Sequence, residues 1–210
     1  MPDDPDLDSA YALETPADNK RLYRAWAETY DAEFVDGTDF RFPALIARTY
    51  LASDGAWPCL DVGCGTGAVA EHLPRDAVLD GLDLSAEMLA VAARKSLYRH
   101  LFEVNLKDPL PMDGASYAGL VSSGTFTHGH VGAEALDELV RVLRADGVAV
   151  ISVKPEIWDE MGFGAAFERL TSAGLIADLG WTEKRIYGDP AKAPDGHGDD
   201  TGLIVHFRRV

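Results

Sequence analysis

A run of glycines stands at a turn in the first third of the chain. Gly63, Gly65 and Gly67 follow an apolar run at residues 59–62 and precede a helical pattern. Glycines at such a turn let the chain bend tightly and let a ligand approach the backbone without an intervening side chain. We therefore predict a cofactor crevice at the carboxyl end of this first strand. A glycine turn that serves packing alone is the other interpretation.

An acidic residue closes the next apolar run. Asp83 lies about 20 positions after the glycines, where a carboxylate accepts hydrogen bonds from ribose hydroxyls. Asp80 is the alternative, but it precedes the last residues of the strand and we expect it to face solvent. Spacing alone leaves two cofactors open, because Gly63, Gly65 and Ala68 also satisfy the dinucleotide pattern G-x-G-x-x-A.

The elements that must position these residues alternate between strands and helices. Predicted helices at residues 68–73, 86–95 and 133–143 separate apolar runs at 59–62, 78–82, 101–104, 117–122 and 148–153. The last third predicts a helix at 163–173 and two strands, 181–187 and 203–207, joined without a helix. Because parallel neighbours need crossover connections, we predict an α/β fold. It is Rossmann-like and doubly wound, with a mostly parallel seven-stranded sheet and a C-terminal antiparallel strand.

The N-terminal part differs from this pattern. Residues 1–18 carry six carboxylates and no Lys or Arg, which predicts an acidic disordered tail. Apolar and aromatic residues at helical spacing predict a helix over 19–34 and a second over 43–52. We expect one domain over 19–210, divided into a helical cap (19–57), a cofactor-binding core (58–154) and a C-terminal helix with an antiparallel strand pair (155–210).

The charge limits the partners. The 210 residues include 19 basic and 35 acidic ones, a formal net charge of −16. Nucleic acids and anionic membranes bind clustered Lys and Arg, so we expect neither as a partner. No run approaches the length of a membrane span, and the start lacks a signal-peptide pattern. We expect a cytoplasmic monomer or homodimer.

Four segments together resemble the class I S-adenosylmethionine-dependent methyltransferases. They are Asp61 to Gly67, Gly81 to Leu89, Asn105 to Pro111 and Leu143 to Gly147. The resemblance implies S-adenosylmethionine as cofactor and S-adenosylhomocysteine as product. A further segment, Ser123 to Val131, is similar to the small methyltransferase-like group that includes the Williams–Beuren deletion-region protein.

The resemblance also implies a role for each matching residue on the methionine side. The turn with Gly63, Gly65, Thr66 and Gly67 would wrap the methionine part of the cofactor. Asp61 would organise this turn from the end of the strand.

On the nucleoside side, Asp83 would hold the ribose and Leu84 and Met88 would pack on the adenine. Asn105 would accept a hydrogen bond from the exocyclic amine, and the Leu106 backbone would meet the ring edge. Plain core packing is the alternative for Leu84 and Met88.

Two aromatic residues of the N-terminal helix complete the expected cofactor site, together with Ser123. Trp26 and Tyr30 lie four residues apart, and in this superfamily such rings reach the cofactor carboxylate or methionine arm. An aromatic stripe that belongs to the core is the alternative for both.

Methyl transfer from a sulfonium depends mainly on alignment and on exclusion of water. A base helps only when the nucleophile loses a proton, and histidine suits that role. His128 and His130 follow the fourth strand, so we predict them as catalytic residues, with His128 preferred. A backbone-bonded histidine is the alternative for each. Lys154 is expected to be a solvated rim residue, with binding of an acidic acceptor as the alternative.

We therefore predict a methyltransferase that acts on a small-molecule acceptor, with no metal, since no His-Glu-x-x-His motif is present. A non-catalytic cofactor-binding regulator is one alternative. A nicotinamide-dependent oxidoreductase is another, but none of the seven tyrosines is followed four residues later by the lysine that the short-chain type needs.

Overall fold

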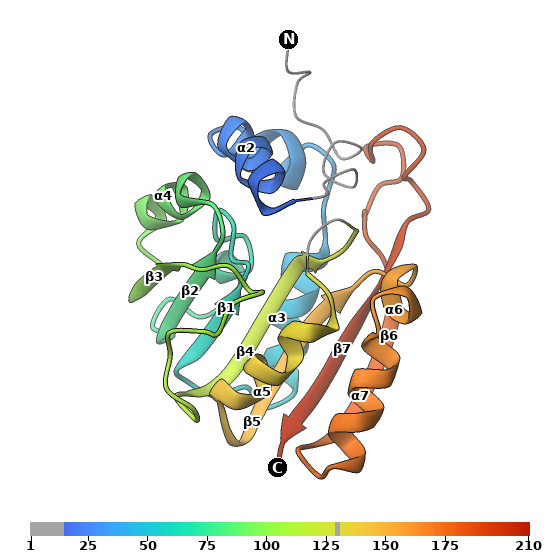
Figure 1. Cartoon of the computed structure of the whole chain (residues 1–210). Coiled ribbons are helices and arrows are strands. Elements are labelled where there is room, and N and C mark those ends of the chain that lie inside the picture. Colours follow the sequence, from blue (N-terminus) through green and yellow to red (C-terminus); the bar gives the residue numbers. More distant parts are fainter. Residues whose placement is uncertain (1–14, 129–130) are drawn as a thin grey trace.

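A seven-stranded sheet forms the centre of the computed structural model, which describes residues 15–128 and 131–210 (Figure 1). The strand order is β3-β2-β1-β4-β5-β7-β6, and only β7 runs against its neighbours. The prediction of a mostly parallel sheet with an antiparallel C-terminal strand is confirmed. The strands are β1 Cys59–Val62, β2 Leu79–Asp83, β3 His100–Glu103, β4 Tyr117–Phe126, β5 Leu143–Val153, β6 Ile176–Arg185 and β7 Thr201–Arg209.

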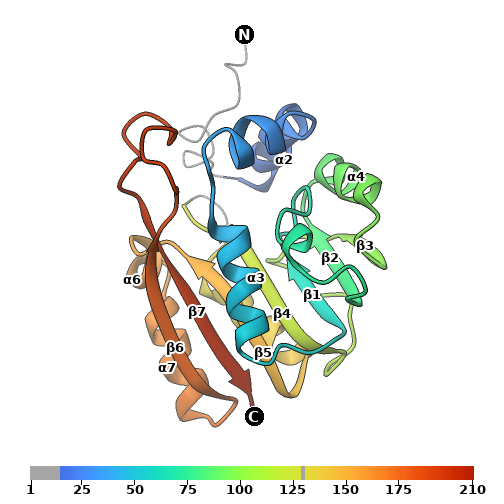
Figure 2. The same cartoon turned by 180° about the vertical axis from the view of Figure 1, so that it is seen from behind.

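Helices cover both faces of the sheet. Figure 1 shows α5, α6 and α7 in front of it, and Figure 2 shows α3 on the opposite face. The α-helices are α2 Pro16–Trp26, α3 Phe42–Ala52, α4 Ala86–Lys95, α5 Leu136–Val142, α6 Ile157–Glu160 and α7 Phe163–Ser172. The short turns are the π-helical η1 Asp31–Asp36 and the 3-10 helices η2 Ala70–His72 and η3 Ala133–Ala135.

Alternation along the strands divides the apolar core into two layers. In β5, Ala149 and Ile151 pack on the side of α5 and α7, whereas Val148 and Val150 pack on the side of α3. Successive side chains of a strand point to opposite faces, so a strand buried on both faces reads as a continuous apolar run. The central strands were predicted from such continuous apolar runs.

The strand order reverses next to β1. From β1 the chain goes to β2 and β3 on one side, and β4 and β5 lie on the other side. In open sheets of this kind ligands bind outside the carboxyl ends of the strands at such a switch point. The glycine turn after β1 therefore lies where the topology leaves a crevice.

The N-terminal helices differ from the prediction. Thr15 Oγ1 accepts a hydrogen bond from Asp18 N, so α2 begins at Pro16, within the predicted tail. The helix predicted over 19–34 ends at Trp26, and a π-helical turn follows because Asp31 is bonded to Thr66 and Lys95 instead of continuing α2. Residues 1–14 of the predicted tail lie outside the described residues.

Other boundaries were also predicted wrongly, among them the start of β5, which lies at Leu143 instead of the predicted 148. The helix expected at 68–73 is only the η2 turn, because Gly67 has a φ of 93° and Pro74 follows at once. Strand β6 begins at Ile176, five positions before the predicted 181, because Gly174 in a left-handed conformation ends the helical region. No helix formed by the described residues has the length and apolarity needed to cross a membrane.

Candidate functional site

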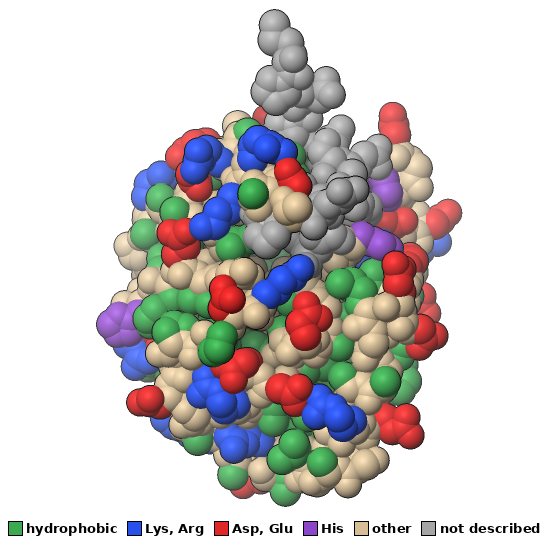
Figure 3. Space-filling model, in the orientation of Figure 1, with side chains coloured by type: hydrophobic (Ala, Val, Ile, Leu, Met, Phe, Trp, Pro, Cys, Tyr) green, Lys and Arg blue, Asp and Glu red, His purple; other side chains and the backbone are tan. Residues whose placement is uncertain are grey.

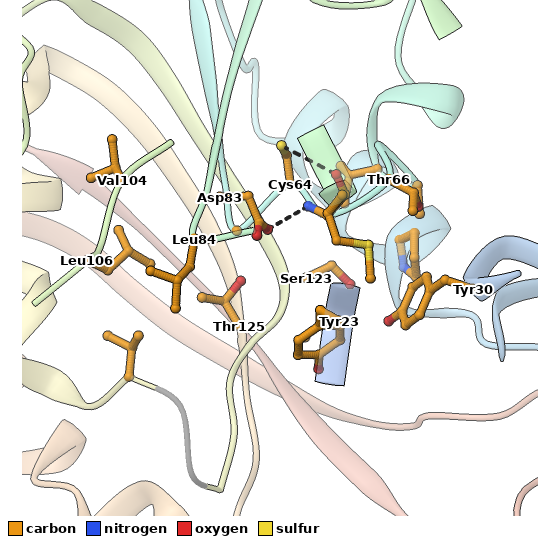
Figure 4. Close-up of a pocket in the computed structure, with 18 of the residues that line it drawn as sticks. Tyr23, Tyr30, Cys64, Thr66, Asp83, Leu84, Val104, Leu106, Ser123 and Thr125 are labelled. Atoms are coloured by element: carbon orange, nitrogen blue, oxygen red, sulfur yellow. Dashed lines mark hydrogen bonds between the residues drawn. The ribbon is translucent and has the colours of Figure 1, made fainter. Parts of the chain in front are cut away.

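A cavity of about 1040 Å³ opens at the carboxyl ends of β1, β2 and β4 (Figure 4). We call it the first cavity. Of the thirteen predicted cofactor-binding residues, ten line it: Tyr30, Gly63, Gly65, Thr66, Asp83, Leu84, Met88, Asn105, Leu106 and Ser123. The structure therefore brings together residues that were selected from five separate segments of the sequence.

The glycine turn needs glycine at specific positions. Gly63 has a φ of 65°, and a Cβ there would collide with Thr125 Oγ1 of β4. Gly65 has a φ of 53°, and a Cβ there would meet no atom within 4 Å. The backbone at Gly65 therefore faces open space, whereas Gly63 lets β4 pack closely against the turn.

Asp83 ties this turn to the end of β2. Its Oδ2 accepts a hydrogen bond of 2.8 Å from Gly65 N, and its Oδ1 accepts one of 2.9 Å from Ser85 N (Figure 4 shows the first of these). Burial raises the pKa of Asp83, although these backbone hydrogen bonds oppose the rise. Since a carboxylate has about four acceptor sites, capacity remains for a ligand hydroxyl.

Asp80 does not face solvent, so that expectation was wrong. It is 2% exposed, and it accepts hydrogen bonds from the Arg99 guanidinium at 2.6 Å and from the Tyr117 hydroxyl at 3.0 Å. Burial and pairing make Asp80 part of the scaffold, and it is not among the residues that line the first cavity.

Asp61 lies beneath the turn rather than in the cavity wall. Its side chain is fully buried, and Tyr98 donates a hydrogen bond of 2.7 Å to Oδ2. Its Oδ1 has no hydrogen-bond partner among the described residues. Burial raises the pKa of Asp61 to about 7, against the lowering effect of the Tyr98 hydrogen bond.

Two further predicted cofactor residues also stand outside the cavity lining. Gly67 packs near the Tyr98 ring. Trp26 is 4% exposed, and its ring centroid lies 5.1 Å from that of Tyr30. For Trp26 the structure matches the alternative of a core aromatic, and its neighbour Tyr30 reaches the cavity in its place.

The adenine side expected from the sequence is an apolar wall. Leu84, Met88 and Leu106 line the first cavity together with Val104, which was not predicted. Figure 4 shows Leu84, Val104 and Leu106 on one side of the cavity and Tyr30 on the other. Asn105 Oδ1 accepts a hydrogen bond from Lys107 N at 3.1 Å, which orients this amide.

The N-terminal segment, which runs from α2 to η1, borders the cavity on the other side. Tyr23 and Tyr30 line it, and the segment is fastened beside Tyr30 through Asp31. Lys95 Nζ of α4 lies 2.6 Å from Asp31 Oδ2, and the Thr66 hydroxyl donates to Asp31 Oδ1. Tyr23 was missed, although it belongs to the same aromatic stripe as Trp26 and Tyr30.

A second cavity of about 580 Å³ adjoins the first. Tyr23, Tyr30, Phe40 and Gly124 line both, so they form the boundary between the two. Its remaining walls come from segments far apart in the sequence: Phe34, Phe42, Phe126, Thr127, Ser152, Val153, Lys154, Ile186, Tyr187 and Gly202. No sequence pattern marked this cavity.

Main-chain contacts close the second cavity between the two ends of the chain. Phe40 and Tyr187 form a β-bridge, and Gly188 N donates to Asp39 O at 3.0 Å. The segment before α3 and the connection between β6 and β7 therefore meet over the cavity.

Lys154 is not a solvated rim residue, so that expectation was wrong. Its side chain is 8% exposed, and its Nζ lies 2.9 Å from Asp200 Oδ2. Asp200 also contacts His197 Nδ1 at 2.9 Å. The ion pair places the lysine at the base of the second cavity and ties it to the start of β7.

One of the two histidines predicted as catalytic, His128, lies at the end of this region. His128 stands two residues after the end of β4, next to Thr127 of the second cavity, but it is not among the residues that line either cavity. His130 lies outside the described residues. On the face shown in Figure 3, described basic side chains stand beside acidic ones rather than in a basic cluster.

Comparison with known proteins identifies a family over the central part of the chain. Residues 60–151 match the model of a family described as a methyltransferase domain. Methyltransferase-like protein 27 of Homo sapiens is 28% identical over 190 residues, which cover 85% of this chain and 77% of that protein. The dTDP-3-amino-3,6-dideoxy-alpha-D-glucopyranose N,N-dimethyltransferase of Streptomyces fradiae is 28% identical over 187 residues, which cover 86% of this chain and 69% of that protein.

Solved structures share the whole fold. The [4+2]-cyclase SpnF matches with a TM-score of 0.66 at 19% identity, over 93% of this chain and 96% of that one. The N-methyltransferase NodS of Bradyrhizobium japonicum WM9, solved with S-adenosylhomocysteine, matches with a TM-score of 0.62 at 15% identity, over 83% of this chain and 90% of that one. The name of the first shows that this fold also serves reactions other than methyl transfer, so the acceptor has to be argued from the site.

Proposed function

We propose that this chain, a class I S-adenosylmethionine-dependent methyltransferase, methylates a small-molecule acceptor by in-line displacement. The observation that carries the proposal is the pair of adjoining cavities with a common boundary at Tyr23, Tyr30, Phe40 and Gly124. A transferase must hold two molecules in contact, and two connected cavities meet that need.

The lining of the first cavity fits the cofactor. Asp83 retains acceptor capacity for ribose hydroxyls, and the open backbone at Gly65 suits a chain that approaches closely. Ser123 Oγ is buried, has no hydrogen-bond partner within residues 15–128 and 131–210, and belongs to a residue that lines the same cavity. A buried polar group without a partner is costly, so a ligand polar atom at Ser123 would relieve an unfavourable state of the free protein.

The chain contributes mainly position and a dry environment. When bound, S-adenosylmethionine supplies an electrophilic methyl group, whose bond to sulfur breaks as the bond to the acceptor's nucleophile forms. Tyr23, Tyr30 and Phe40 confine the space where the two cavities join and exclude water from it. Correct alignment is worth several kcal/mol in such a transfer, about 7–11 in the best model systems.

The acceptor's nucleophile also releases a proton when it is a hydroxyl or an amine. We assign this proton to His128 as general base, since it directly follows Thr127 of the second cavity. Because its ring does not line the cavity, a change of its side-chain conformation is part of this assignment.

The decisive experiment uses a cofactor with a trideuterated methyl group and an extract of small metabolites. We expect a labelled product together with an equal amount of S-adenosylhomocysteine, and neither with the Asp83→Ala variant. Tight binding of S-adenosylhomocysteine with no labelled small molecule would contradict the proposal and favour a cofactor-binding regulator.

A further inference from the structure

The second cavity is lined mainly by aromatic side chains. Seven of its lining residues are Phe or Tyr, and they come from the N-terminal segment, β4 and the connection after β6. The rings also contact one another: the centroids of Tyr30 and Phe34 are 5.2 Å apart, and those of Phe34 and Phe40 are 5.1 Å apart. Aromatic rings in mutual contact form a rigid apolar wall with flat faces.

Apart from the hydroxyls of Tyr23, Tyr30 and Tyr187, few polar side-chain groups line this cavity. The lining side chains with a polar group other than a tyrosine hydroxyl are Thr127, Ser152 and Lys154. Ser152 Oγ accepts a hydrogen bond of 2.8 Å from Gly124 N, and Lys154 is paired with Asp200. Thr127 is different, because it is 8% exposed and its Oγ1 has no hydrogen-bond partner among the described residues.

This lining argues against a strongly polar acceptor. The polar atoms of a sugar or a diphosphate that are buried in such a cavity need hydrogen-bond partners there. Lys154 is the cavity's one cationic side chain among the described residues, and Asp200 already compensates its charge. A nucleotide sugar, the substrate class in the name of the Streptomyces relative, therefore does not match the second cavity.

We propose that the second cavity takes a flat, uncharged aromatic acceptor, a phenol or an aromatic amine, held by ring packing and by one hydrogen bond to Thr127 Oγ1. This inference rests on the proposed function and names its substrate class. In the reaction the acceptor loses one proton from its O–H or N–H group and gains one methyl group.

Two hydroxyls, one near the end of β4 and one just after it, provide a matched pair of variants. Of the two cavities, Ser123 lines the first and Thr127 lines the second. Both have a buried oxygen for which the described part of the chain offers no hydrogen-bond partner. Thr127→Val keeps the side-chain shape and removes an unpaired buried hydroxyl, so the variant should unfold at the same temperature as the wild type or higher. Ser123→Ala serves as the control for the cofactor side.

The experiment measures binding by calorimetry in the presence of saturating S-adenosylhomocysteine. The probes are a panel of substituted phenols and anilines, set against amino sugars, nucleoside diphosphate sugars and aliphatic amines. We expect binding within the aromatic panel alone, and Thr127→Val should weaken it about threefold to tenfold, the effect of one neutral hydrogen bond. The same variant should leave S-adenosylhomocysteine affinity unchanged. Ser123→Ala should weaken S-adenosylhomocysteine binding and leave binding of the aromatic probes unchanged.

The outcomes separate this inference from the proposed function. Binding and methylation of amino sugars or aliphatic amines, without aromatic binding, would overturn the aromatic class and leave methyl transfer to small molecules intact. Equal aromatic affinity of the wild type and Thr127→Val would overturn the role of Thr127. Aromatic binding without methylation of any probe, when S-adenosylmethionine also binds, would contradict the proposed function and leave the cavity assignment standing.

Discussion

The Tyr98 hydroxyl donates a hydrogen bond of 2.7 Å to Asp61 Oδ2, directly beneath the glycine turn of the first cavity. Neither side chain lines the cavity, yet their bond joins the end of β1 to the segment that leads into β3. The acidic residue at the start of the glycine motif therefore acts from below as a support of the turn. The protonation state of Asp61 therefore makes the stability of the protein depend on pH.

Asp61 should make the protein less stable as the pH rises. Its pKa is raised from 3.8 to about 7 by burial, so between these values the unfolded chain ionises while the folded chain keeps the proton. The stabilisation is complete below about pH 4 and is lost as the pH rises through about 7. Denaturant titrations of wild type and Asp61→Asn from pH 4 to pH 8 should diverge by at most about 4 kcal/mol. A constant difference across this range would contradict the account.

Tyr98→Phe provides the control for this effect. The hydrogen bond from Tyr98 lowers the pKa of Asp61, so its loss should move the pKa further up. The stabilities of wild type and Asp61→Asn should therefore continue to diverge to a higher pH when both carry Tyr98→Phe, so that the upper end of the pH-dependent range shifts upward. A downward shift would argue against a donated hydrogen bond.

Gly63→Ala should weaken cofactor binding and folding together. The left-handed backbone costs about 1–2 kcal/mol for a residue with a Cβ, and the new Cβ collides with Thr125. The double variant Gly63→Ala with Thr125→Ala removes the collision but not the backbone strain, so it should recover part of the loss. Thermal unfolding and S-adenosylhomocysteine titration measure both effects. No recovery in the double variant would show that the contact with β4 is unimportant.

Lys95→Met should lower cofactor affinity through the N-terminal segment. Lys95 holds Asp31, which also bonds Thr66, and the neighbouring Tyr30 lines the cavity. We expect a rise of about fivefold in the Kd of S-adenosylhomocysteine, or about 1 kcal/mol. Arg94→Ala breaks the exposed pair with Glu28, whose side chain is 75% exposed, and should change this Kd little. Equal effects of the two variants would mean that general electrostatics, not the Asp31 contact, sets the affinity.

The lining of the first cavity could be predicted from the sequence because the motifs that indicate it are local. Gly63, Gly65 and Asp83 stand at strand ends, where parallel topology brings them to one edge of the sheet. The break after Trp26 was not accessible, since it depends on contacts of Asp31 with residues that lie far along the chain.

The second cavity could not be predicted from the sequence, because it too depends on contacts between residues that lie far apart along the chain. Phe40 meets Tyr187, and Lys154 meets Asp200, only after the antiparallel strands have formed. Tyr23 and Tyr30 belong to a helical aromatic stripe, but no sequence period connects that stripe to Phe40 or Tyr187. Tertiary contacts between the two ends of the chain create this part of the site.

His128→Gln should lower the turnover of acceptors that lose a proton and leave cofactor affinity unchanged. A base of this kind contributes about 10²–10⁴-fold to a rate. Steady-state kinetics with an acceptor found in the labelling experiment, together with S-adenosylhomocysteine calorimetry, separate the two quantities. Parallel losses in kcat and cofactor affinity would assign His128 a structural role instead.

The most direct test of the account is a crystal structure with S-adenosylhomocysteine and a bound phenol or aniline acceptor. We expect S-adenosylhomocysteine in the first cavity, with its ribose at Asp83, and the aromatic ring in the second cavity, with a polar group at Thr127. An acceptor bound outside the second cavity, or S-adenosylhomocysteine bound away from Asp83, would contradict it.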